Sequence, residues 1–275
     1  PCRVGVVSGS VIGGIYTTEE ERANYHNKGN KRVGVFTITK MIGNMAAGEV
    51  AIRTGFKGSN FCVTTACASG TQSIGEAFRS IKHGYLDAAI AGGTEHSDIG
   101  FCYASFNNMH AVTRSTDVDR ASIPFDAERS GFVLGDGCGL LVLEEYEHAK
   151  ARGAKIYCEV VGGGASADAY HFTAPHPEGK GAMKAMRDAI KDAGMVHGHP
   201  HFPVYVDSPL ANEATRVFLQ TDTSFLDDEA CALIRSGINP LYFDDLHTAV
   251  TKEDSMALNT DKTPKVILSS SGMCD

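Results

Sequence analysis

The stretch VTTACASGTQSIGEAFRSIKHG, residues 63–84, places a single cysteine where a β-prone run ends and a helical pattern begins. A thiol at such a junction is exposed above the sheet edge and lies near the partial positive charge of the helix N-terminus, which favours the thiolate. Small residues surround Cys67 and leave room for a thioester to approach: Ala66, Ala68, Ser69 and Gly70. The pattern leaves two interpretations open, a nucleophile or a cysteine buried in a core, and the second is the commoner one for a cysteine taken at random.

Apolar, β-prone runs alternate with helical patterns through the first two-thirds of the chain. Strands are expected over residues 3–10, 48–55, 87–95, 139–145 and 155–164. Helices are expected over residues 144–154 and 179–194, closed by Gly153 and Gly194. Runs that are apolar on both faces are typical of a sheet covered by helices on each side, so the sequence predicts an α/β fold.

Composition limits the classes of function. With 275 residues, 43% of them apolar, the chain can build a sizeable core, and no run approaches the ~18 apolar residues of a membrane span. The net charge of −8 argues against a general polyanion-binding surface. Eight scattered cysteines without a C-x-x-C pair indicate a reducing cytoplasm. The opening residues, PCRVGVVSGS, read like the interior of a longer sequence.

Three long stretches carry a family resemblance: TACASGTQSIGEAFRSIKHGYLDAAIAGGTEHSD, ASIPFDAERSGFVLGDGCGLLVLEEYEHAKARGAKIYCEVVGGG and SADAYHFTAPHPEG. Their order and spacing resemble the β-ketoacyl-acyl carrier protein synthases, most closely the type II condensing enzymes of fatty acid biosynthesis, over about residues 3–194. The resemblance implies an acyltransferase with a thiolase-like fold of two stacked α/β halves, here incomplete, and usually a homodimer. It also implies acyl carrier protein and an acyl thioester as partners, with no cofactor and no metal.

The resemblance assigns roles to particular residues. Cys67 would take the acyl chain as a thioester, and its backbone N–H would contribute to the oxyanion hole. Val11 and Ile12 match the segment that borders the acyl pocket. His171 and Thr173 match a mobile loop near the pocket entrance.

Condensation in that family also needs two histidines, a lysine and a glycine-rich loop, in patterns of the type N-A-H-G-T, K-x-x-x-G-H and G-F-G-G-x-N. None of these patterns occurs in the 275 residues, so we expect little turnover of a malonyl substrate. The other histidines before residue 195 are interpreted as solvated or locally hydrogen-bonded. Asp126 and Arg129 are interpreted as a structural ion pair within a turn.

From about residue 199 the pattern changes. FPVYVDSPLANEATRVF, GINPLYFDDLHTAVTKEDSMALN and PKVILSSSGMCD resemble the β-CASP region of metallo-β-lactamase-fold RNA-processing nucleases over residues 199–275. We therefore place a boundary near 195, between a β-ketoacyl synthase-like part (1–195) and a β-CASP-like α/β part (196–275). The resemblance places a turn at Ser269, Ser270, Ser271 and Gly272, where hydroxyls and amides could contact an RNA phosphate.

Metal chemistry is not expected in this tail, because the family's H-x-H-x-D-H cluster and its other metal ligands are missing. The alternating His197, His199 and His201 are interpreted as a solvated loop, since Pro200 interrupts them and no carboxylate is adjacent.

Three hypotheses remain open: an enzyme that acylates Cys67, an RNA-binding module carried by the tail, and a composite of two fragments with no integrated activity. The composite hypothesis predicts that residues 195–275 do not complete the sheet begun by residues 155–165.

Overall fold

The computed structural model describes residues 2–124, 126–194 and 265–271. The chain divides into two compact units between His148 and Ala149. The first unit contains β1 (Val4–Gly9), α1 (Ile15–Lys28), η1 (Asn30–Arg32), α2 (Thr37–Met41), α3 (Met45–Thr54), β2 (Asn60–Val63), α4 (Ser69–Lys82), β3 (Ala88–Glu95), α5 (Gly100–Asn108), η2 (Val118–Arg120) and β4 (Gly137–Glu144). The second contains β5 (Glu159–Ser166), α7 (Lys180–Asp192) and β6 (Lys265–Ser271), and α6 (Tyr146–Ala151) spans the division.

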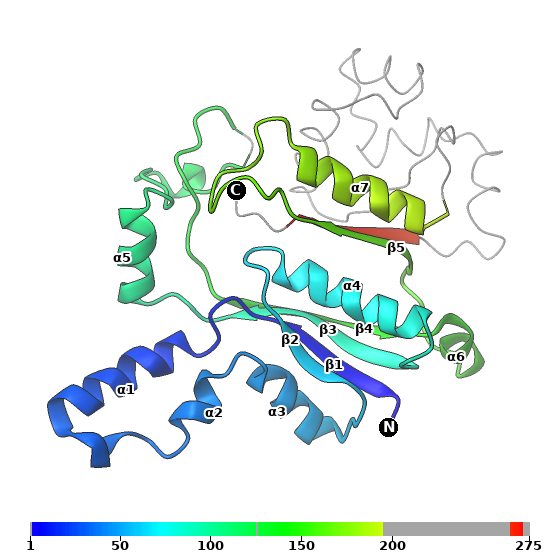
Figure 1. Ribbon diagram of the computed structural model, residues 1–275, viewed down its shortest axis with the longest axis horizontal. Coiled ribbons are helices and arrows are strands. Elements are labelled where there is room, and N and C mark those ends of the chain that lie inside the picture. Colours follow the sequence, from blue (N-terminus) through cyan, green and yellow to red (C-terminus); the bar gives the residue numbers. More distant parts are fainter. Residues whose placement is uncertain (1, 125, 195–264, 272–275) are drawn as a thin grey trace. The chain divides into compact units, whose positions relative to one another are not determined.

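The first unit is built on a four-stranded sheet in the order β2-β1-β3-β4 (Figure 1). Strand β1 runs parallel to both β2 and β3, whereas β4 is antiparallel to β3. In this register Val7 lies opposite Phe61 on one side and Ala91 on the other. Because the three parallel strands end at the same edge, the segments that follow them meet there.

Helix α4 covers one face of this sheet and α3 lies on the other, as Figure 1 shows. Alternate residues of β1 and β3 point toward α4 and form a small core with Val7, Ala77, Leu86, Ala89 and Ala91. On the other face, the Asn60 side chain donates to the Ala47 carbonyl at 2.8 Å and ties α3 to β2. The sandwich of helix, sheet and helix confirms the predicted α/β class for the described residues.

The strand expected over residues 48–55 is wrong. Residues 48–54 belong to α3, and Gly55 caps the end of this helix in the left-handed conformation with φ of 71°. A short apolar run does not distinguish a buried strand from a buried helix, and Ala and Glu are strong helix formers. The expected strands over 3–10, 87–95 and 139–145 are confirmed as β1, β3 and β4.

In the second unit α7 packs closely on β5. A Cβ atom at Gly162 would overlap the Ala189 carbonyl, and one at Gly164 would overlap the Ala185 carbonyl. Ala185 and Ala189 are fully buried, so only small residues fill this contact. Gly194 closes the end of α7 with φ of 69°, as the sequence predicts.

The tail contributes a strand to the second unit. Strand β6 runs parallel to β5, with Gly164 opposite Ser269 and Ser166 opposite Ser271. The turn expected at residues 269–271 is therefore a strand, and Gly272 lies outside the described residues, as do His197, His199 and His201. Because β6 extends the sheet of β5, this part of the tail is not a separate lobe.

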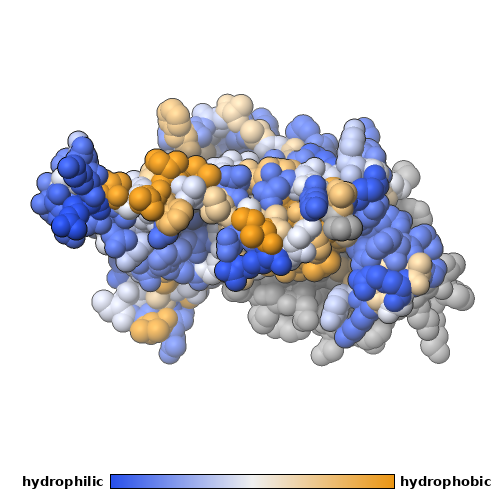
Figure 2. Space-filling view, turned by 90° about the horizontal axis from the view of Figure 1, so that it is seen from below, coloured by the Kyte–Doolittle hydropathy of each residue, from blue (hydrophilic) through white to orange (hydrophobic). Residues whose placement is uncertain are grey.

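Apolar side chains remain exposed on the first unit. Around α2, Val35 is 91% exposed, and on β4, Val142 is 73% exposed. Figure 2 shows hydrophobic surface in separate patches on this face, whereas the end of the molecule that carries α1 is hydrophilic. Uncovered apolar surface of this kind favours association with another surface. Within the described residues, no helix is both long and apolar enough to cross a bilayer.

Candidate active site

Cys67 lies in a tight turn between β2 and α4, and its side chain is exposed. The preceding Ala66 has φ of 49°, a left-handed conformation that costs a residue with a Cβ atom energy. The Ser69 hydroxyl holds the turn, because it donates to the Ala66 carbonyl at 2.6 Å and accepts from the Thr65 N–H at 2.8 Å. The Ala68 N–H also bonds to the Thr65 carbonyl at 3.1 Å. The turn therefore presents Cys67 from a rigid, strained backbone.

Small residues bring the first turn of α4 against the sheet. A Cβ atom at Gly93 would be 3.1 Å from the Cα of Gly70, and a Cβ atom at Gly9 would overlap the Ser69 carbonyl. The buried Ser73 hydroxyl lies 2.7 Å from the Gly70 carbonyl and 2.8 Å from the Gly92 carbonyl. These contacts fix the N-terminus of α4, and with it the partial positive charge that favours a thiolate, relative to β1 and β3.

The loop that carries Val11 and Ile12 lies beside the Cys67 turn. The Ser10 N–H donates to the Val63 carbonyl at 3.2 Å, and the Thr64 hydroxyl donates to the Ser10 carbonyl at 2.9 Å. Val11 and Ile12 are each 41% exposed. The structure thus places these predicted pocket residues at the same sheet edge as Cys67.

Sequence reasoning missed Glu95, the last residue of β3. Its carboxylate accepts the Val11 N–H at 2.6 Å and the Ile12 N–H at 3.3 Å, and the Ser10 hydroxyl donates to it at 3.3 Å. The only signal in the sequence is a charged residue directly after an apolar strand, at the edge where the parallel strands end.

A second carboxylate organises the loop that follows Glu95. Asp136 accepts the Ser97 N–H at 2.7 Å and the Asp98 N–H at 2.9 Å, and it contacts the His96 ring. Desolvation alone would raise the pKa of Asp136, but the hydrogen bonds from His96, Asp98 and Ser97 outweigh it and lower that pKa. The His96 ring also lies 5.5 Å from the Tyr16 ring, measured between centroids.

His171 and Thr173 belong to the second compact unit, whereas Cys67 belongs to the first. The Nδ1 atom of His171 accepts the Thr173 N–H at 3.2 Å and the Ala174 N–H at 3.1 Å. Asp168 anchors the same segment by accepting the Gly181 N–H at 2.9 Å. The loop is therefore locally ordered, and its approach to Cys67 remains a prediction.

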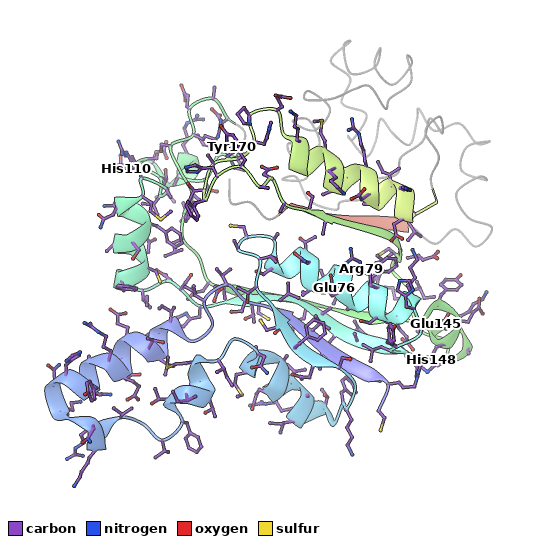
Figure 3. The ribbon with its side chains drawn as sticks, in the orientation of Figure 1. Glu76, Arg79, His110, Glu145, His148 and Tyr170 are labelled. Atoms are coloured by element: carbon purple, nitrogen blue, oxygen red, sulfur yellow. The ribbon has the colours of Figure 1, made fainter. Side chains whose placement is uncertain are left out.

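Three other histidines, His110, His148 and His176, have local partners. Figure 3 shows His148 beside Glu145, whose carboxylate accepts the backbone N–H of His148 at 2.7 Å, and the Nδ1 atom of the His148 ring lies 2.6 Å from the Glu144 carboxylate. His110 lies at the end of α5, and the Arg114 guanidinium donates to its Nδ1 atom at 3.0 Å. The Nδ1 atom of His176 accepts the Glu178 N–H at 3.1 Å, and the His176 ring lies 5.2 Å from that of Tyr170, measured between centroids. These contacts agree with the interpretation of local hydrogen bonding.

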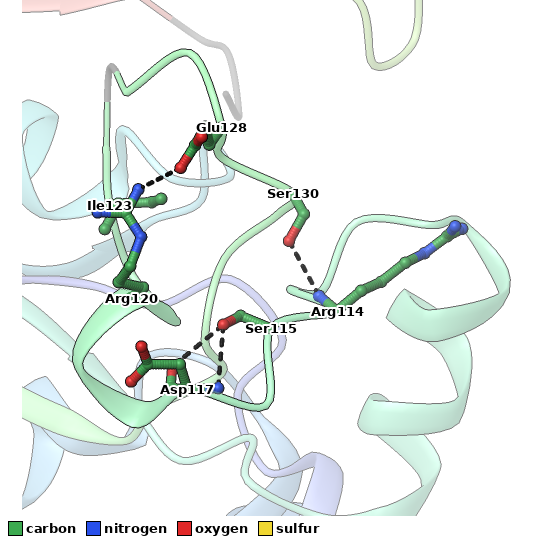
Figure 4. Close-up of a pocket in the computed structure, with 7 residues that line it drawn as sticks. All are labelled: Arg114, Ser115, Asp117, Arg120, Ile123, Glu128 and Ser130. Carbon is green, nitrogen blue, oxygen red and sulfur yellow. Dashed lines mark hydrogen bonds and ion pairs between the residues drawn. The ribbon is translucent and has the colours of Figure 1, made fainter.

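A separate cavity of about 350 Å³ lies in the segment between α5 and β4 (Figure 4). Its lining comprises Arg114, Ser115, Asp117, Arg120, Ile123, Glu128 and Ser130. Arg120 pairs with Glu128 at 2.8 Å and with Asp126 at 3.4 Å. The ion pair predicted between Asp126 and Arg129 is therefore wrong. The Asp126 carboxylate pairs with Arg120, whereas the Arg129 guanidinium donates to the backbone carbonyl of Asp126. The paired charges make this cavity a structural feature of the loop.

Comparisons with known proteins agree with this geometry. Residues 1–149, more than half of the chain, match the model of the β-ketoacyl synthase N-terminal domain. The chain belongs to the β-ketoacyl synthase family. The 3-oxoacyl-[acyl-carrier-protein] synthase 2 of Synechocystis sp. is 46% identical over 217 residues, which are 77% of this chain and 51% of that protein. The synthase 2 of Staphylococcus aureus is 47% identical over 193 residues, or 70% and 48% of the two chains.

Solved structures of ketosynthases share the fold. A β-ketoacyl synthase from Burkholderia phymatum superposes with a TM-score of 0.64 at 33% identity, over 80% of this chain and 54% of that one. A ketosynthase bound to its type II PKS acyl-carrier protein and a hexaketide gives a TM-score of 0.68 at 31% identity, over 71% and 50% of the chains. This β-ketoacyl synthase chain therefore has a thiolase-like ketosynthase fold, and it spans about half the length of the curated relatives it matches.

A second family model, the Beta-Casp domain, matches residues 185–275. Of this range, the structure describes the end of α7 and strand β6. The family boundary predicted near 195 and the packing boundary at 148 are different divisions of the chain, because β6 packs with β5.

Proposed function

We propose that Cys67 is the acyl-accepting nucleophile of a β-ketoacyl-acyl carrier protein synthase of fatty acid biosynthesis. The observation that carries the proposal is the exposed thiol on a strained turn at the N-terminus of α4, in a chain of the β-ketoacyl synthase family. Few structural cysteines occupy such a position, whereas a nucleophile needs both exposure and a nearby positive potential.

The proposed step is transthioesterification. The Cys67 sulfur attacks the carbonyl carbon of an acyl thioester, and the backbone N–H of Cys67 stabilises the oxyanion that forms. The bond between that carbon and the donor sulfur then breaks, and the donor thiol leaves with the proton that Cys67 lost. The donor is acyl carrier protein, by analogy with the ketosynthase complex among the structural neighbours. Val11 and Ile12 border the site that the acyl chain enters.

Condensation is a separate proposal. The two histidines, the lysine and the glycine-rich loop that the family uses with a malonyl donor are not found as motifs in these 275 residues. We therefore propose that this chain forms the acyl-enzyme but condenses it poorly. The exposed apolar residues around α2 and β4 support a proposal that the chain associates, as a homodimer or with other chains.

Intact mass spectrometry tests the central step. Incubation of the purified chain with hexanoyl-carrier protein is expected to add one hexanoyl group, and the Cys67→Ser variant is expected to gain no stable thioester adduct. Cys138→Ser is the matched control, because Cys138 is also exposed but lies on β4. Absence of an adduct on the native chain would overturn the proposal.

The Beta-Casp match favours a second candidate function, binding of single-stranded RNA by the tail. The phosphate-contacting turn expected at residues 269–272 is not part of this proposal, because residues 269–271 belong to strand β6. Filter binding at low and high salt provides the test, since phosphate contacts weaken as salt rises. Retention no greater than background at low salt would rule the binding out.

A further inference from the structure

We propose that Glu95 is a positioning residue, whose carboxylate holds the loop bearing Val11 and Ile12 against the Cys67 turn. In this role Glu95 sets which acyl chains reach Cys67. The role deepens the proposed acyl transfer and rests on it.

The hydrogen bonds form a continuous connection from the Cys67 turn to Glu95. Ser10 bonds to Val63 and Thr64 through its backbone, at 3.2 and 2.9 Å, so it is fixed to the segment that leads into Cys67. The hydroxyl of the same serine donates to Glu95 at 3.3 Å and accepts the Gly13 N–H at 3.2 Å. Ser10 therefore links the carboxylate to the turn that presents the nucleophile.

Glu95 in turn holds the two residues that border the proposed acyl site. One carboxylate oxygen accepts the N–H groups of both Val11 and Ile12, at 2.6 and 3.3 Å. Hydrogen bonds to an ionised acceptor are stronger than those between neutral groups. Without this acceptor, the two N–H groups would face solvent, and Val11 and Ile12 would lose their fixed direction.

The backbone of Glu95 is itself well placed for such a role. Glu95 ends β3, where it lies opposite Gly137 of β4 in the sheet register. A side chain projecting from a strand holds its partners more precisely than one projecting from a loop. The loop also contacts α2, because the Gly14 N–H donates to the Met41 carbonyl at 3.2 Å. Glu95 thus joins the loop that carries Val11 and Ile12 to strand β3 of the sheet.

Backbone hydrogen exchange of the loop tests the positioning role directly. In Glu95→Ala, the N–H groups of Val11 and Ile12 are expected to exchange about tenfold faster than in the native chain, because their shared acceptor is gone. Glu95→Gln retains a carbonyl oxygen of the same reach, so its exchange is expected between the two. Glu49→Ala is the matched control, since Glu49 is an exposed glutamate of the same unit that pairs with Arg53 along its own helix. Unchanged exchange in Glu95→Ala would overturn the proposal.

Acylation of Cys67 by hexanoyl- and palmitoyl-carrier protein tests the consequence for substrate. We expect Glu95→Ala to change the ratio of the two rates at least severalfold, with Glu95→Gln restoring most of the native ratio. A merely structural role would slow both rates equally and leave the ratio unchanged, which would contradict the specificity claim. Failure of the native chain to acylate at all would overturn the proposed function instead, and the exchange data would then decide the loop-holding role alone.

Discussion

Replacing Gly9 by alanine is expected to displace the nucleophile without touching it. Gly9 ends β1, and a Cβ atom there would lie 2.8 Å from the Gly70 nitrogen and would overlap the Ser69 carbonyl. Both neighbours are backbone atoms of the first turn of α4, so no side-chain rotation relieves the contact. Overpacking of this kind costs typically about 1–3 kcal/mol. The helix must therefore shift away from the sheet and carry the Cys67 turn with it.

Two measurements follow the displacement. Thermal unfolding of Gly9→Ala is expected several degrees below that of the native chain. The rate of Cys67 acylation is expected to fall by roughly tenfold to a hundredfold, since small misplacements of a reacting group are costly.

Gly75→Ala is the matched control for this helix. Gly75 lies within α4, and a Cβ atom there meets nothing within 4 Å. The change should stabilise the helix by about 0.5–1 kcal/mol, because alanine is the better helix former, and should leave acylation unchanged. If Gly9→Ala matches the native chain in both unfolding temperature and acylation rate, the close contact between α4 and β1 does not position Cys67.

Three further predictions concern the rest of the described fold. Leu86 is 3% exposed in the core beneath α4, so Leu86→Ala should lower the free energy of unfolding by about 2–5 kcal/mol in a urea titration, and a loss well under this range would contradict its place in the core. The pKa values of Asp87 and Asp136 are lowered in the folded chain, that of Asp87 chiefly by its hydrogen bond from Arg3. The stability that these two carboxylates contribute should be fully present above the ordinary aspartate pKa of about 3.9, and it should be lost as pH falls from there through the lower pKa values of the folded chain. Thermal unfolding across that pH range should show a shallower loss in Asp136→Asn than in the native chain, and equal slopes would contradict the assignment. Deleting residues 265–275 should remove β6 and expose the edge of β5, which hydrogen exchange would report as faster exchange of the β5 amides; unchanged exchange would mean that β6 does not pair there.

Local patterns predicted the site better than they predicted its surroundings. The strand, cysteine and helix around Cys67 follow one another directly, so the sequence alone indicates the junction that the structure shows. Strands β1 and β3 could also be predicted from the sequence, because their apolar runs are bounded by turn residues. The helix at residues 48–54 could not be predicted in this way. The same apolar content suits a strand or a helix, and only packing against β1 and β2 decides between them.

Contacts distant in sequence could not be read from the chain. Glu95 meets Val11 across 84 positions, and no local pattern links the two. Asp136 and Ser97, 39 positions apart, present the same difficulty. The partner of Asp126 was misjudged for a related reason, because helix-like spacing favoured Arg129 whereas the loop folds back to Arg120. Such pairs depend on which strands lie side by side, which follows from the whole sheet.

The direct test of the account is the position of the acyl group after incubation with hexanoyl-carrier protein, determined by peptide mass spectrometry. The account predicts a hexanoyl thioester on the peptide that contains Cys67, and its absence from the peptides that contain the other cysteines exposed in the described part of the chain, Cys2, Cys138 and Cys158. A hexanoyl group on one of those cysteines, or no acylated peptide at all, would contradict the claim that Cys67 is the nucleophile.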